Sequence, residues 1–320
     1  MTEVSENSPG TGLGIEKKEN SHRAFLEKLF QDLQVTEKDK GEYLETNNRE
    51  GEYSAILRRV DERSFQNIRV LIAKYAHYYL KVCHHVSQDQ FETGLIKHLE
   101  RVRRSYFLSY NFNNEAFFLS GLATRGKIKS ITEFNELETE ALAHTMDNPK
   151  AYIRRRKEVE KWMGITDSDN PPVYAGLGAE GSPAWPEQKR GACPGFGNGV
   201  LVLKKDISNR VIYTFQDSMR KRSSIEEQQL NLDHALIAKA LRDFELDPDY
   251  NLEALERRMG DLWFYVEAQV LGGVRVKDIK EIILNKTNPN PRVFTVNLAR
   301  RLFPGIDLTV HQDSHSEDCR

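Results

Sequence analysis

Glu267 and Gln269 are the residues of this chain whose types and spacing could do chemistry. They stand two apart in the segment Trp263–Leu271, which is rich in aromatic and β-branched residues, a composition typical of a β-strand. Side chains alternate along a strand, so both should project from the same face. Burying a carboxylate and an amide costs free energy unless each has a partner. The pair therefore indicates either a functional carboxylate with a supporting amide, or the wet face of an edge strand.

The sequence that begins at Glu267 and runs Glu-Ala-Gln-Val-Leu-Gly-Gly-Val resembles the catalytic strand of ADP-ribosyltransferases. In that family a Glu-x-Glu or Gln-x-Glu pair precedes a turn. Its carboxylate stabilises the positive charge that develops on the ribose of NAD as nicotinamide leaves. This chain departs from the family pattern, because Gln269 stands where the second glutamate is expected. The resemblance leaves open whether Glu267 or Gln269 holds the catalytic position.

Three earlier segments strengthen the resemblance. They read Val-Tyr-Ala-Gly-Leu over 173–177, Phe-Gly-Asn-Gly over 196–199, and Thr-Phe-Gln-Asp-Ser over 214–218. In this order, and with the strand described above, they are similar to an uncharacterised bacterial domain family associated with the ADP-ribosyltransferase fold. The similar stretch covers roughly residues 171–285. A second departure lies in the first segment, where Ala175 replaces the arginine of the usual Tyr-Arg-Gly element.

The resemblance also implies roles for residues of these segments. NAD, as a substrate, would lie in a cleft between two small sheets, with Tyr174 and Gly176 near its nicotinamide. Ser218 would support the catalytic strand beside Glu267 and Gln269. The remaining residues expected at NAD are Phe196, Gly197, Phe215 and, as the anchoring cation of the family, Arg125, with Arg210 as the weaker alternative.

Other motifs do not support a second chemistry. The letters of a dinucleotide fingerprint occur at Gly176–Gly181, but prolines at 183 and 186 follow and prevent the helix that would hold a pyrophosphate. The three cysteines are far apart and have no metal-ligand spacing. The basic runs Arg154–Lys157 and Arg220–Arg222 read as solvated faces, although either could meet a phosphate.

Charge and hydropathy restrict the partners. The 320 residues include 46 Lys and Arg against 48 Asp and Glu, for a net charge of −2, so no excess charge attracts nucleic acid or an anionic membrane. No apolar run approaches the roughly 20 residues of a membrane span. We therefore expect neither nucleic acid nor a membrane as a partner.

The chain changes character near residue 168. We expect a disordered tail over residues 1–20, a helical domain over 21–168, an α+β domain over 169–312 and a loose tail over 313–320. The expected strands are Val173–Leu177, Val200–Lys204, Val211–Phe215, Trp263–Leu271 and Ile279–Leu284. The resulting fold class is α+β, an ADP-ribosyltransferase-like split β-sandwich preceded by an α-helical N-terminal region.

The resemblance implies a mono-ADP-ribosyltransferase, a glycosyltransferase that modifies a protein acceptor with NAD. It also implies a bacterial effector, made in the bacterial cytoplasm and secreted into a host cell whose protein it modifies. Two alternatives stay open. A catalytically inactive module of the same fold would only bind a protein partner, and a hydrolase could pair Glu267 with Asp217.

Overall fold

The computed structural model describes residues 12–47, 51–81, 86–113, 115–142, 148–165, 171–180, 197, 199–215, 218, 228–245, 266–285 and 293–311. The helices are α1 (Gly12–Asp32), α2 (Glu37–Thr46), α3 (Ser54–Lys81), α4 (Gln88–Ser105), α5 (Glu115–Arg125), α6 (Glu136–Leu142), α7 (Pro149–Trp162), α8 (Leu232–Glu245) and α10 (Val293–Leu302). The strands are β1 (Tyr106–Phe112), β2 (Val173–Ala179), β3 (Gly199–Leu203), β4 (Val211–Phe215), β5 (Gln229–Leu230), β6 (Val266–Val270), β7 (Ile279–Asn285) and β8 (Asp307–His311). Short 3-10 turns occur at η1 (Ile131–Glu133), η3 (Lys205–Arg210) and η5 (Val276–Asp278).

The described strands form one mixed eight-stranded sheet in the order β5-β4-β6-β2-β1-β3-β7-β8. Neighbours are antiparallel except for β7 and β8, which are parallel. The α+β class is confirmed, and each expected range contains a strand. Lys204 and Leu271 lie just beyond the ends of β3 and β6, and Trp263–Tyr265 lie outside the described residues. The resemblance implies two small sheets with a cleft between them, whereas these strands are hydrogen-bonded into one.

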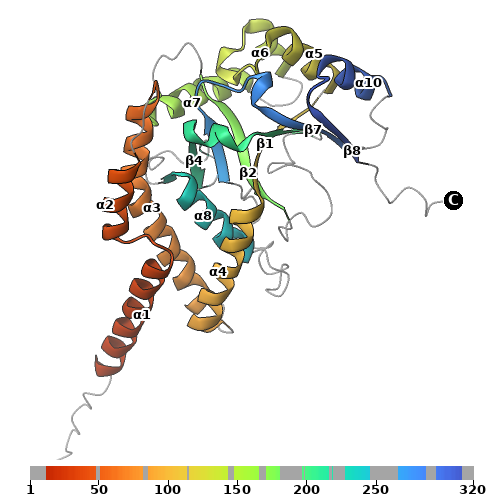
Figure 1. Ribbon diagram of the computed structural model, residues 1–320. Helices are drawn as coiled ribbons and strands as arrows, with labels where there is room; N and C mark the ends of the chain where they lie inside the picture. Colours follow the sequence, from red (N-terminus) through yellow and green to blue (C-terminus); the bar gives the residue numbers. More distant parts are fainter. Residues whose placement is uncertain are drawn as a thin grey trace, which may run out of the picture.

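One face of the sheet is apolar and carries most of the core. Side chains such as Leu177, Tyr213 and Val266 project from it and are buried with residues of α3, α4 and α8. Figure 1 shows these three helices gathered beside the β4 and β2 region, with α5, α6 and α10 near the other end of the sheet. Alternation along the strands therefore leaves Glu267 and Gln269 on the opposite face.

Helix α7 covers part of this opposite face. Its residue Val159 and the following Met163 form a second buried cluster with Ile212 of β4 and Leu271. The helix begins at Pro149, because the Asn148 side chain accepts a hydrogen bond from the backbone N–H of Ala151 and Pro149 occupies the first turn, where its missing N–H costs nothing. A capping box formed by Ser87 and Gln90 begins α4 in a similar way.

Two parts of the expected organisation need correction. Residues 12–20, predicted to belong to a disordered tail, are the first turns of α1. Strand β1 lies within the range predicted to be a helical domain, yet it pairs with both β2 and β3. The sheet therefore crosses the predicted boundary at residue 168. Strand β1 escapes prediction because it follows α4 directly, with no glycine or proline to separate the two elements.

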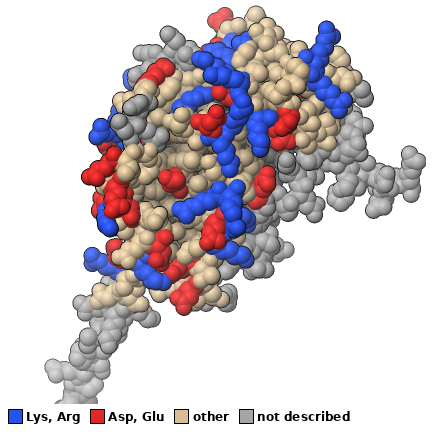
Figure 2. Space-filling view, in the orientation of Figure 1, with Lys and Arg blue, Asp and Glu red and all other residues tan. Residues whose placement is uncertain are grey.

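The surface matches the balanced composition. Figure 2 shows one face on which acidic and basic side chains are interspersed, apart from a band of Lys and Arg that runs down from its upper edge. Within the described ranges, no helix combines the length and the apolar character that crossing a membrane requires.

Candidate functional site

Strand β6 places Glu267 and Gln269 in the interior of the sheet. It lies between β4 and β2, with Glu267 opposite Thr214 on one side and Gly176 on the other. Both side chains are fully buried, with exposed fractions of 0%. The edge-strand alternative is therefore wrong, because β6 has a hydrogen-bonded neighbour along each side.

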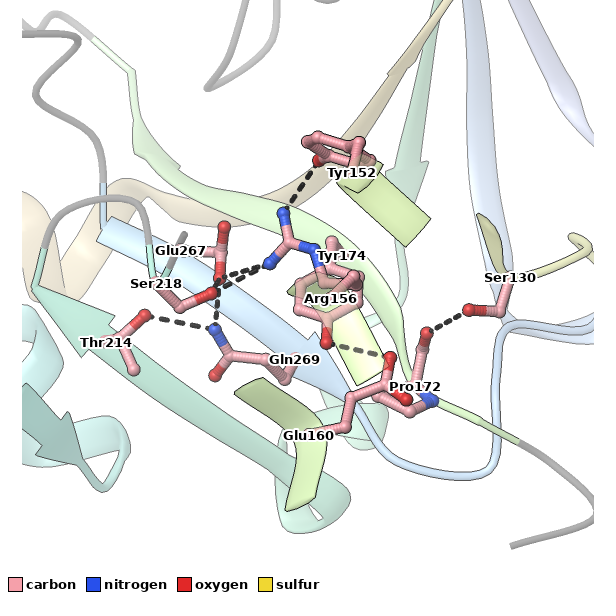
Figure 3. A network of polar contacts seen from close by, with 10 residues as sticks. All are labelled: Ser130, Tyr152, Arg156, Glu160, Pro172, Tyr174, Thr214, Ser218, Glu267 and Gln269. Carbon is pink, nitrogen blue, oxygen red and sulfur yellow. Dashed lines mark hydrogen bonds and ion pairs between the residues drawn. The ribbon is translucent and has the colours of Figure 1, made fainter. Parts of the chain in front are cut away.

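One oxygen of the Glu267 carboxylate gathers hydrogen bonds from three residues (Figure 3). The Ser218 hydroxyl donates a short hydrogen bond to Oε1, Gln269 Nε2 donates at 2.6 Å, and Arg156 Nη1 lies 3.4 Å away. Buried carboxylates need such partners, since desolvation otherwise favours the neutral acid. The contacts match an ionised Glu267 whose charge is balanced by the guanidinium of Arg156.

Arg156 is the functional candidate that the sequence analysis missed. It comes from α7, is 3% exposed, and donates from Nη1 to Ser218 Oγ at 2.8 Å and from Nη2 to the Tyr152 hydroxyl at 2.9 Å. Its guanidinium carbon lies 3.7 Å from the centre of the Tyr174 ring, a close cation–π contact. The interpretation of Arg154–Lys157 as a solvated run is therefore wrong for Arg156. A signal was present, since Arg156 shares a helical face with Tyr152 and Val159.

Gln269 is held by two contacts through the same nitrogen. Its Nε2 donates to Glu267 and, at 3.0 Å, to Thr214 Oγ1, which uses both amide hydrogens. Its Oε1 is buried and has no hydrogen-bond partner among the described residues. The amide therefore fixes the carboxylate on one side and presents an unused acceptor on the other.

A second carboxyl group lies near this cluster. The Tyr174 hydroxyl donates to Glu160 Oε1 at 3.0 Å, and burial raises the pKa of the Glu160 carboxyl. Burial also raises the pKa of the Tyr174 phenol well above its usual value, so that Tyr174 remains a neutral donor. Helix α7 thus supplies both the Arg156 guanidinium, which lies over the Tyr174 ring, and the Glu160 carboxyl group, which accepts from the Tyr174 hydroxyl.

A cavity of about 190 Å³ opens beside Arg156 and Tyr174. The described residues around it come from β1, β2, α7 and the segment between α5 and η1; they include Ser109, Asn111, Lys129, Tyr152, Arg156 and Tyr174. Glu267 is not one of its lining residues. Figure 3 shows Arg156 between Glu267 and Tyr152, so this guanidinium connects the buried carboxylate with a residue that lines the cavity.

The structure brings together five of the predicted site residues. Tyr174 and Gly176 lie on β2 directly opposite Gln269 and Glu267, and Ser218 binds Glu267. Asp217 and Phe196 lie outside the described residues.

The other predicted residues lie elsewhere. Phe215 projects from the apolar face and meets Tyr75 of α3 edge to face at 5.9 Å. The Gly197 carbonyl accepts a 3.0 Å hydrogen bond from Asn111, a cavity residue. Arg125 is exposed at the end of α5 and is not among the cavity's described lining residues. Arg210 binds the backbone carbonyls of Leu271 and Gly273, and the Asp278 carboxylate at 2.7 Å.

Comparison with known proteins assigns no family to the chain: no protein-family model matches it, and no curated protein is significantly similar. Within the described ranges, no three His, Cys, Asp or Glu side chains are grouped so that they could hold a metal ion.

Proposed function

We propose that this protein is a mono-ADP-ribosyltransferase that transfers the ADP-ribose of NAD to a protein acceptor. The observation that carries the proposal is the convergence of Arg156, Ser218 and Glu267, from three distant parts of the chain, in one hydrogen-bonded cluster. A glutamate on a central strand, oriented by a serine and an amide, is the arrangement that the sequence resemblance implies. Arg156 adds a cation to it.

The residues fit the chemistry of glycosyl transfer. In the proposed reaction the bond between the ribose carbon and the nicotinamide nitrogen breaks, and nicotinamide leaves with the bonding electron pair as a neutral molecule. An acceptor side chain forms the new bond to the same carbon and loses its proton. Glu267 would stabilise the positive charge on the ribose, because a fixed, preorganised carboxylate interacts most strongly where charge develops.

Each residue that surrounds Glu267 would have a role in the proposed reaction. Ser218 and Gln269 hold the carboxylate on one oxygen, which limits its rotation. Gly176, opposite Glu267 on β2, places no side chain beside the carboxylate. The buried Gln269 Oε1 offers an acceptor for a ribose hydroxyl.

Arg156 and Tyr174 support binding of the NAD end that reacts. A guanidinium suits the phosphates of NAD, and a stacked aromatic ring suits nicotinamide. The cavity of about 190 Å³ is below the roughly 300 Å³ at which ligand pockets usually begin, so it would take one end of NAD. We propose that Arg156 swings from Glu267 toward a phosphate when NAD enters, which gives the ribose access to the carboxylate.

The finer fold belongs to the same proposal. The strands form one sheet, with β2 and β1 hydrogen-bonded to each other at its centre. The cavity is lined by residues from both of these strands. We propose the ADP-ribosyltransferase type of fold from the sequence resemblance, with NAD beside these two central strands, although a split β-sandwich would have two separate sheets.

One observation favours a second function, the inactive module that only binds a partner. Glu267 is fully buried and already paired with Arg156, as a purely structural ion pair would be. Incubation with NAD labelled on its adenosine ribose, in the presence of cell lysate, separates the two functions. The transferase predicts labelled protein and released nicotinamide from the wild type, both lost in Glu267→Gln. Absence of both products from the wild type would favour the inactive module.

A further inference from the structure

Helix α7 carries a stripe of basic side chains on the side turned away from the Arg156 cluster. The stripe consists of Lys150, Arg154, Lys157 and Lys161, which are all exposed. Their spacing of four, three and four residues places them on one helical face. Arg156 and Val159 lie on the opposite face and are buried. Helix α7 therefore has a cationic outer side and an inner side that reaches the candidate site.

The cations of the stripe differ from several other exposed cations of the molecule, which have a carboxylate partner. Some exposed cations elsewhere pair with a carboxylate one turn away, as in Lys28–Asp32, Arg58–Glu62 and Arg104–Glu100. No ion pair joins the four stripe residues to any carboxylate in the described part of the chain. Like charges three or four residues apart destabilise a helix. The first turn of α7 also has no acidic residue, so Lys150 opposes the helix dipole.

A hollow of about 370 Å³ lies along this stripe, between α7 and the segment of η1 and α6. Three of the stripe residues line it, together with the apolar side chains of Phe134 and Ile153 and one carboxylate, Glu136. A surface of this kind offers cations for an acidic ligand and an apolar floor for a hydrophobic side chain. It is open, so a polypeptide segment can lie along it.

We propose that this outer side of α7 is a docking surface for an acidic segment of the acceptor protein. The stripe spans about 16 Å, the rise of a helix over its length, which an extended segment of about five residues would cover. The helix is about 10 Å thick, so a segment docked outside lies close to the cavity inside. The choice of the acceptor as partner rests on the proposed transferase function.

An acidic polypeptide fits the surface better than nucleic acid does. Glu136 lines the hollow and Glu158 is exposed beside the stripe, and both would repel a regular row of phosphates. The chain as a whole has a net charge of −2, which adds no long-range attraction for a polyanion. A peptide can place its few carboxylates on the stripe and keep uncharged residues near Glu136.

The test measures peptide binding and needs no NAD. The probe is a short fluorescein-labelled peptide of glutamates around one leucine, titrated with the full chain at low ionic strength and followed by fluorescence anisotropy. We expect the double variant Arg154→Glu/Lys157→Glu to bind at least about tenfold more weakly, because attraction becomes repulsion. The matched control, Arg103→Glu/Arg104→Glu, reverses two exposed charges on α4 and should bind like the wild type. If the first variant does not fold, Arg154→Gln/Lys157→Gln replaces it.

Each result decides the proposal. Selective loss in the α7 variant, together with weaker binding at higher salt, supports the docking surface. Failure of the wild type to bind the peptide, an equal loss in both variants, or tighter binding of a labelled single-stranded oligonucleotide would overturn it. Since no transfer is measured, an inactive enzyme with intact peptide binding refutes the transferase alone, and an active enzyme without peptide binding refutes the docking surface alone.

Discussion

Arg156 and Glu267 form a buried ion pair at 3.4 Å across 111 residues of sequence, with side-chain exposures of 4% and 0%. The ion pair links α7 to strand β6. Among the described residues, no backbone hydrogen bond joins these two elements. Within a buried pair, the loss of one partner leaves the other charge uncompensated, which costs far more than the pair contributes when intact. The same two residues can therefore be tested for stability and for catalysis separately.

Replacement of Glu267 by glutamine should destabilise the fold by about 3 kcal/mol, since Arg156 then remains buried without a counter-charge. The double variant Glu267→Gln/Arg156→Met should recover part of this loss, because neither charge is left. Urea denaturation of the wild type, both single variants and the double variant measures the coupling. The exposed Glu158→Gln serves as the control, with an expected change below about 0.5 kcal/mol. Strictly additive effects of the two changes would contradict the buried pair.

The variant Arg156→Lys should lose most transfer activity although it keeps the charge. A lysine has one nitrogen, whereas the Arg156 fork reaches Ser218 from Nη1 and Tyr152 from Nη2, and lysine does not stack on an aromatic ring in the same way. Its neighbour Arg155, which lies over Trp162 and pairs with Glu158 at the surface, provides the matched control Arg155→Lys. Initial rates of nicotinamide release compare the two variants. Equal activity of both would show that Arg156 is not needed at the site.

The stability of the variant Gln269→Glu, relative to that of the wild type, should depend on pH. A carboxylate at 269 would contact Glu267 where Gln269 Nε2 now donates at 2.6 Å, and two adjacent carboxylates retain one proton, which raises a pKa of the pair. A group whose pKa is raised in the folded state stabilises the fold at low pH. This stabilisation is lost as the pH rises through the folded-state pKa. Thermal unfolding should therefore show a larger deficit against the wild type at pH 8 than at pH 5. A constant deficit would contradict contact between the two positions.

A swap of the two side chains tests which position would be catalytic under the proposed function. The double variant Glu267→Gln/Gln269→Glu keeps one carboxylate and one amide on the same face of β6. If Glu267 holds the catalytic position, the swap should be as inactive as Glu267→Gln alone. Recovery of nicotinamide release in the swapped protein would assign the catalytic position to residue 269.

The sequence predicts the site residues that lie on strand β6, but it does not single out Arg156, which lies on helix α7. Alternation along β6 was enough to place Glu267 and Gln269 on one face, since the period of a strand is fixed by its backbone. Register between strands is set by long-range pairing, so the meeting of Gly176 with Glu267 rested on the resemblance alone. Arg156 was missed because a basic run reads as solvated unless the helical phase is compared with its apolar neighbours. Strand β1, which lines the cavity, was missed because nothing in the sequence separates it from α4.

His234 gives a prediction for acid stability that is independent of function. Its Nδ1 lies 2.6 Å from Ser64 Oγ, and burial lowers the pKa of its imidazole to about 3. A lowered folded-state pKa means that the unfolded chain binds the proton first, so stability falls as the pH drops from about 6.5 toward about 3, by up to about 1.4 kcal/mol per unit. The variant His234→Asn retains an acceptor for Ser64 and should flatten this slope in urea titrations at several pH values. The control variant His77→Asn, at an exposed histidine, should show the same slope of stability against pH as the wild type. An identical slope in all three proteins would contradict the prediction that His234 causes this pH dependence.

The rate of nicotinamide release from NAD, measured with and without cell lysate as the source of acceptor, tests the central claim most directly. The account predicts release by the wild type, with labelled protein when lysate is present, and a rate at least about a hundredfold lower in Glu267→Gln, as is usual when a preorganised electrostatic group is removed. The variant Glu267→Gln/Arg156→Met, which leaves no charge unpaired, keeps the comparison valid if the single variant does not fold. Wild-type protein that releases no nicotinamide, or variants that release it as fast as the wild type, would contradict the proposed transferase.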